Sequence, residues 1–80
     1  MGTMIKSINT EKYQKLLNWL KAGRLAKELS VRELAIIIDE PFQFISKIET
    51  GQRKLNIHEY VQYCEALNLD PAEGLVIFTK

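Results

Sequence analysis

Apolar residues recur at spacings of three and four along most of the chain, which is the period of helices buried on one face. The first such stripe is formed by Tyr13, Leu16, Leu17 and Leu20, with Arg24 on the same face. Thr10 can cap a helix that starts at Glu11, and the pattern predicts that this helix runs to about Lys27. Gly23 inside it costs roughly 1 kcal/mol relative to alanine, which indicates close packing at that point.

The second helix is short and begins with a capping signal. Ser30 and Glu33 have the Ser-x-x-Glu spacing of a capping box, which predicts a helix that starts at Val31. Its length is about eight residues, because Asp39 and Glu40 interrupt the pattern. The inward positions are Val31, Leu34, Ala35 and Ile38.

The third helix follows after about four residues, and two short helices joined so closely cross at a steep angle. Pro41 belongs in its first turn, Ile45 and Ile48 form its inward stripe, and Gly51 at the C′ position ends it. Its other face carries Phe42, Gln43, Phe44, Ser46 and Lys47. Because such a helix fits the major groove, where glutamine and lysine can bond to base edges, it has the geometry of a recognition helix.

Two further helix starts follow. Asn56 caps a fourth helix with Glu59 at N3, and the apolar face of that helix comprises Ile57, Tyr60, Val61, Cys64 and Leu67. Pro71 marks the first residue of a last helix, which Gly74 should keep short. Residues 75–78 are apolar on all sides, so they belong either to the core or to a subunit contact. The pattern thus predicts an all-α fold, a compact bundle of four to five short helices with a central helix-turn-helix.

The length and the cysteine content limit the class of protein. A chain of 80 residues allows one domain. We expect residues 1–9 to be an N-terminal arm or a cloning scar and residues 10–80 to be a single helix-turn-helix DNA-binding domain. The apolar runs are too short for a membrane helix, and the start does not resemble a signal peptide. Cys64 is the only cysteine, which suits the reducing cytoplasm. We expect a cytoplasmic, nucleoid-associated protein.

The net charge of +1 is low for a nucleic-acid binder, but its distribution is uneven. Residues 1–27 hold six lysines and arginines and one acid, whereas residues 55–80 hold four acids and one lysine. A basic face can steer a protein toward phosphate even when the net charge is small. The alternative interpretation is an ordinary solvated helix face.

No arrangement typical of an enzyme appears in the sequence, so we predict no catalytic residue, metal, cofactor or small-molecule substrate. His58 is the only histidine, and we expect it at the surface. Cys64 lies on an apolar face and should be a core thiol. Trp19 and Tyr63 lie off the main stripes and are expected either in rim packing or in a dimer contact.

The pattern I-S-K-I-E-x-G-x-R at residues 45–53, together with Leu34 and Ala35, resembles the Xre/Cro type of repressor domain. The resemblance covers roughly residues 13–73 and implies a lambda-repressor-like fold. It implies that base edges are read by Phe42, Gln43, Ser46 and Lys47. It places Arg32, Phe44, Gln52, Arg53 and Lys54 near the DNA backbone. It also implies a structural ion pair between Arg24 and Glu49.

Two positions depart from the family pattern, which often has glutamine where this chain has Val31 and Phe42. Phe42 can pack on a thymine methyl group but donates no hydrogen bond. Ile36 and Ile37 replace residues that are usually polar, and beside Phe42 they would form an apolar patch.

Two functions are consistent with these features. The first is a homodimeric, sequence-specific transcriptional repressor that inserts the helix at about residues 41–49 into the major groove of double-stranded DNA. The second is a helix-turn-helix protein-interaction module, such as an antitoxin or adaptor, with little specific DNA binding. Specific binding to duplex DNA would separate them.

Overall fold

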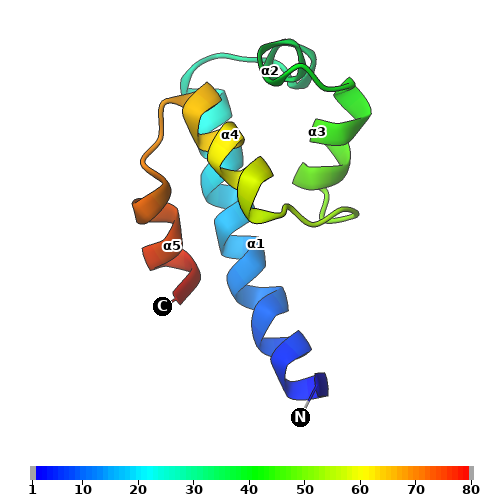
Figure 1. Ribbon diagram of the computed structural model, residues 1–80, viewed down its shortest axis with the longest axis vertical. Coiled ribbons are helices and arrows are strands. Elements are labelled where there is room, and N and C mark those ends of the chain that lie inside the picture. Colours follow the sequence, from blue (N-terminus) through cyan, green and yellow to red (C-terminus); the bar gives the residue numbers. More distant parts are fainter. Residues whose placement is uncertain (1, 80) are drawn as a thin grey trace.

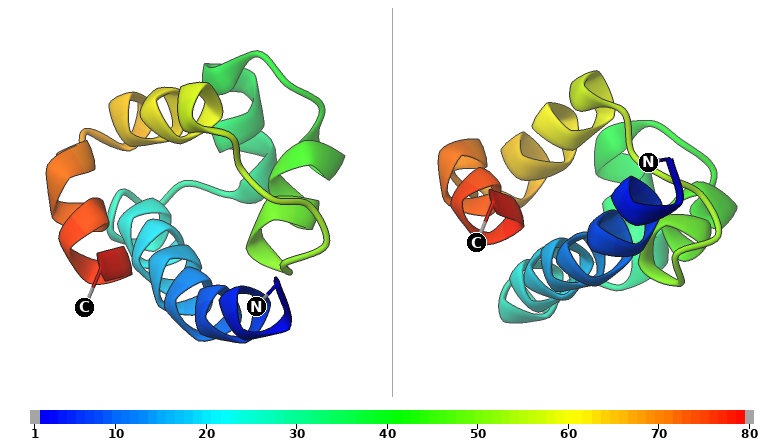
Figure 2. Two further views of the ribbon diagram at one scale, coloured as in Figure 1. Left: turned by 60° about the horizontal axis from the view of Figure 1, so that its bottom comes forward. Right: turned by 90° about the horizontal axis from the view of Figure 1, so that it is seen from below.

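The computed structural model describes residues 2–79, with side-chain detail for residues 11–79. These residues form five helices and no strand: α1 (Gly2–Ala26), α2 (Val31–Ile38), α3 (Phe42–Glu49), α4 (Ile57–Leu67) and α5 (Pro71–Thr79). The predicted all-α bundle is therefore confirmed (Figure 1). Figure 2 shows that α3 and α5 lie on opposite sides of the molecule, with α1 and α4 between them.

The start of α1 was predicted wrongly. The backbone is already helical at Gly2, so Thr10 lies inside the helix and does not cap it. Residues 2–9 consequently extend α1 rather than forming a separate arm, and Met1 lies outside the described residues. A residue such as threonine caps a helix only where the chain before it leaves helical geometry. No proline precedes Thr10 to force that departure.

The predicted signals around α2 and α3 are nearly all confirmed. Ser30 and Glu33 form both hydrogen bonds of the capping box, at 2.7 and 3.0 Å. Asp39 ends α2 in the left-handed conformation with φ 66°, which a short polar side chain tolerates. Pro41 is the N-cap of α3 and not its first residue. Gly51 follows the helix with φ 79°, as the prediction for the C′ position required.

The capping box at the start of α4 is also confirmed, through Asn56 and Glu59. The predicted apolar face of α4 was partly wrong, since Ile57 is 69% exposed. Ile57 is the first residue of the helix, before the turns that contact the core. Tyr63 is instead completely buried, because it lies one turn from both Tyr60 and Leu67 on the inward face. Cys64 is a buried thiol, as predicted, and burial raises its pKa.

The core contains the inward stripes of α1 to α4, namely Leu16, Leu17, Leu20, Leu34, Ala35, Ile45, Ile48, Tyr60, Tyr63, Cys64 and Leu67. Two glycines lie where another element approaches a helix backbone closely. A Cβ on Gly23 would lie 2.8 Å from Leu69 Cδ1, which accounts for the close packing predicted there. A Cβ on Gly74 would lie 2.6 Å from the Trp19 ring. The glycine predicted to shorten α5 therefore lets α5 pack on α1, and Trp19 takes part in this packing.

Candidate nucleic-acid interface

Helix α3 has a buried face and an exposed face. Ile45 and Ile48 have no exposed surface and attach the helix to the core. Gln43, Ser46 and Lys47 are all exposed, and among residues 11–79 their side chains form no hydrogen bond or ion pair. Their donors and acceptors are thus available to a ligand. The helix presents polar groups outward from a backbone that its opposite, buried face holds in place.

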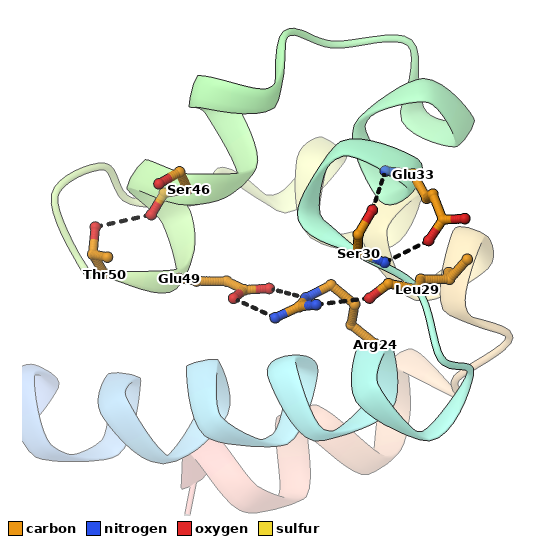
Figure 3. Close-up of polar contacts among 7 residues, drawn as sticks. All are labelled: Arg24, Leu29, Ser30, Glu33, Ser46, Glu49 and Thr50. Carbon is orange, nitrogen blue, oxygen red and sulfur yellow. Dashed lines mark hydrogen bonds and ion pairs between the residues drawn. The ribbon is translucent and has the colours of Figure 1, made fainter.

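A buried ion pair connects α1 to the end of α3. The Arg24 Nε atom lies 2.6 Å from Glu49 Oε2, and Arg24 Nη2 lies 3.0 Å from Glu49 Oε1. The remaining terminal nitrogen donates to the Leu29 carbonyl oxygen at 2.7 Å (Figure 3). The two side chains are only 8% and 9% exposed. The hydrogen bonding of the Arg24 guanidinium to the Glu49 carboxylate raises the pKa of Arg24 above its usual value. This is the ion pair that the family resemblance implied.

Arg53 and Phe44 were expected beside the DNA backbone, and the structure gives both an internal contact. The Arg53 guanidinium donates two hydrogen bonds of 2.9 Å to the carboxylate of Glu59. It also lies over the ring of Phe44, which is half-buried against the core. The hydrogen bond from Arg53 lowers the pKa of Glu59, so the carboxylate is ionised at neutral pH. Sequence reasoning missed this pair, although the N3 position of Glu59 placed a carboxylate just after the loop.

The remaining predicted site residues lie at the two ends of α3. Arg32 of α2 contacts the first residue of α3, with its guanidinium carbon 4.0 Å from the centroid of the Phe42 ring. Gln52 and Lys54 are exposed in the loop that follows α3. The structure thus groups these side chains around the exposed face of one helix. Ile36 and Ile37 on α2 are 78% and 53% exposed, so both positions of this pair face outward.

The described part of the chain offers neither a membrane span nor a cluster of metal ligands. None of its helices is both long enough and apolar enough to cross a membrane. Its histidine, cysteine and acidic side chains form no group of three or more that could hold a metal ion.

Comparison with known proteins agrees with this architecture. The helix-turn-helix family model matches residues 20–74. An XRE-family like protein from Pseudomonas syringae pv. tomato str. DC3000 is 32% identical, with a TM-score of 0.88 over 95% of this chain and 93% of that one. The clp gene regulator ClgR from C. glutamicum shares the fold, with 24% identity and a TM-score of 0.74 over 85% and 88% of the two chains. No curated protein sequence matches the chain. The chain belongs to the Xre-type helix-turn-helix family.

Proposed function

We propose that this protein is a DNA-binding transcriptional regulator that binds a specific operator as a homodimer, with α3 in the major groove, and represses by occupying that site. The family supports DNA binding and transcriptional regulation. The observation that carries the finer proposal is the state of α3, whose exposed polar side chains have no partner among residues 11–79 while its inward face is buried. Such a helix is ordered before it meets DNA, which reduces the entropy lost on binding.

The exposed side chains of α3 match the chemistry of base edges. The Gln43 amide can donate to adenine N7 and accept from the adenine N6 amino group, and the Lys47 ammonium can donate to guanine O6 and N7. Ser46 can bond to either kind of base. Gln52 and Lys54 follow α3 in an exposed loop, where they are suited to phosphate contacts that set the position of the protein on the duplex.

Exposed apolar side chains support a dimer. Leu75 and Val76 on α5 are 46% and 52% exposed. Leu75 and Ile57 also line an apolar groove of about 180 Å³ between α1, α4 and α5. A domain of this size buries only a modest fraction of its surface when it folds, and association with a second copy would bury more. A two-fold dimer presents two copies of α3 to half-sites about 34 Å apart.

The proposal is tested by selecting binding sites from random duplexes and measuring the affinity of the selected site at several salt concentrations. We expect a palindromic site bound about 10³-fold more tightly than random DNA, or better. Absence of enrichment, with weak binding that disappears in moderate salt, would contradict specific recognition.

Gln43→Ala should relax the preference at one base pair of each half-site by about 1–3 kcal/mol, because it removes a two-point contact to a base. Gln52→Ala is the matched control, since it removes the same amide from the phosphate-facing loop and should weaken all sequences alike. Competition binding with single-base variants of the selected site measures both effects. Uniform loss across sequences for both variants would count against the role of Gln43.

Glu59→Gln should strengthen DNA binding, because it removes the carboxylate that accepts both hydrogen bonds from Arg53. Glutamine is also accepted at N3 of a capping box, so the start of α4 is retained. A freed Arg53 that contacts one phosphate steepens the plot of log affinity against log salt by about 0.9. Glu65→Gln, at an exposed position of the same helix, controls for the change in net charge. Equal affinities of the two variants would show that the Glu59 pairing does not restrain Arg53.

The exposure of Ile36 and Ile37 favours a second candidate function, a protein-interaction module such as an antitoxin or adaptor. Apolar side chains at adjacent exposed positions are a feature of protein contacts. This function predicts that DNA affinity does not exceed the non-specific range of about 10⁻⁴ to 10⁻⁶ M.

A further inference from the structure

A contact between α2 and α3 brings a cation onto an aromatic ring at the start of the recognition helix. The guanidinium carbon of Arg32 lies 4.0 Å from the centroid of the Phe42 ring, within the range of a cation–π contact. Phe42 is the first residue of α3 and is 37% exposed. The two side chains therefore form one exposed unit, and each restricts the movement of the other.

Among the arginines, Arg32 alone has no polar partner in the described part of the chain. Arg24 is bonded to Glu49, and both terminal nitrogens of Arg53 are bonded to Glu59. The contact with Phe42 is a cation–π contact and takes up none of the five N–H donors of the Arg32 guanidinium. The contact thus restricts the position of the donor fork and leaves its N–H groups available.

The donor fork and the ring have different preferred targets on base edges. Arginine donates two hydrogen bonds to guanine O6 and N7, which is the commonest specific contact in the major groove. An aromatic side chain packs on the thymine methyl group. Because the guanidinium and the ring are in contact, the two bases they reach must be neighbours in the DNA sequence.

We propose that Arg32 and Phe42 act together to read a guanine next to a thymine in each half-site, with Arg32 bonded to the guanine and Phe42 packed on the thymine methyl. This inference rests on the proposed function, and it assigns Arg32 to a base and not to the phosphate expected from the sequence. The location of the contact supports the assignment of Arg32 to a base, because Phe42 is the first residue of α3, the helix proposed to enter the groove. Arg32 supplies the hydrogen-bond donors that phenylalanine lacks.

The test compares site selection by the full chain with selection by Arg32→Ala and Arg32→Lys. We expect Arg32→Ala to lose the guanine preference at one base pair of each half-site by about 5- to 150-fold, while preferences elsewhere persist. Arg32→Lys keeps the charge but not the planar fork, so it should retain the salt dependence and lose most of that preference. If Arg32→Ala instead weakens every sequence alike and reduces the salt slope by about 0.9, Arg32 contacts a phosphate and the inference is overturned.

The partner base is tested by replacing the adjacent thymine of the selected site with uracil, which removes only the methyl group. Wild-type binding should weaken about fourfold, the expected value of one buried methyl group, whereas Phe42→Ala should not distinguish the two duplexes. A wild-type protein that binds both duplexes equally overturns the assignment of Phe42. The failures are distinguishable: a selected site indifferent to Arg32 and Phe42 overturns this inference alone, whereas no selected site at all overturns the proposed function with it.

Discussion

Arg24→Met should remove a large part of the free energy of unfolding, about 3–5 kcal/mol. The substitution strands the Glu49 carboxylate in a site where its side chain is only 9% exposed, and removing one partner of a buried ion pair costs about 3–5 kcal/mol. It also removes the donor to the Leu29 carbonyl. A chain of 80 residues has a total stability of roughly 4–12 kcal/mol. Urea denaturation followed by circular dichroism and by Trp19 fluorescence measures the loss.

Two further variants isolate the cause. Lys21→Met removes an exposed cation from the same helix and should change stability by less than about 0.5 kcal/mol. The double variant Arg24→Met/Glu49→Leu replaces the whole pair with apolar side chains, which can be nearly neutral, so it should be more stable than Arg24→Met alone. A double variant no more stable than Arg24→Met would show that the stranded Glu49 carboxylate is not the cause of the loss.

Gly74→Ala should destabilise the domain by about 1–3 kcal/mol, the usual cost of forcing extra volume into a packed site. The new Cβ would meet the Trp19 ring at 2.6 Å and a Leu16 methyl carbon at 3.1 Å, besides the Tyr60 hydroxyl. The Tyr60 hydroxyl donates to the Pro71 carbonyl at 2.5 Å, so moving it disrupts the start of α5. The midpoint temperature of thermal unfolding should fall by several degrees for each kcal/mol of stability lost.

Gly23→Ala is the matched control, because it makes the same change within a helix. Its nearest neighbour is Leu69 Cδ1 at 2.8 Å, the end of a flexible side chain that can rotate away. Alanine also gains about 1 kcal/mol of helix propensity over glycine at both positions. We therefore expect Gly23→Ala to stay within about 1 kcal/mol of wild type. Similar losses for both variants would mean that the contact at Gly74 relaxes without displacing α5.

Features that depend on neighbours in the sequence were predicted well. The capping boxes at Ser30 and Asn56 and the glycine after α3 are confirmed at the predicted residues. Each is set by side-chain to backbone bonds within a few residues, so a short segment contains all the groups involved. The prediction of a cap at Thr10 was wrong because a capping signal is equally local. It does not show whether the preceding chain is itself helical.

Contacts between distant elements were predicted only where the family resemblance supplied them, as it did for Arg24 and Glu49. The Arg53–Glu59 pair, which joins the loop after α3 to α4, was missed, because the resemblance implied only a place near the DNA backbone for Arg53. Tyr63 was expected in rim packing or a dimer contact because it was read as lying off the main apolar stripe, yet the side chain is fully buried. The periodicity of α4 contained this information, because positions 60, 63 and 67 follow one helical stripe.

The way α3 is held has a consequence for how new DNA preferences arise in this protein. Its attachment uses Ile45, Ile48 and Glu49, none of which belongs to the proposed base-reading set. Substitutions in that proposed set should therefore change the operator with little effect on folding. Such mutations would be close to neutral until a new promoter selects among them, so regulators that descend from one ancestor could diverge in target while keeping the same scaffold. Exchanging the whole proposed set, with Arg32 and Phe42 included, between two relatives should accordingly transfer operator choice.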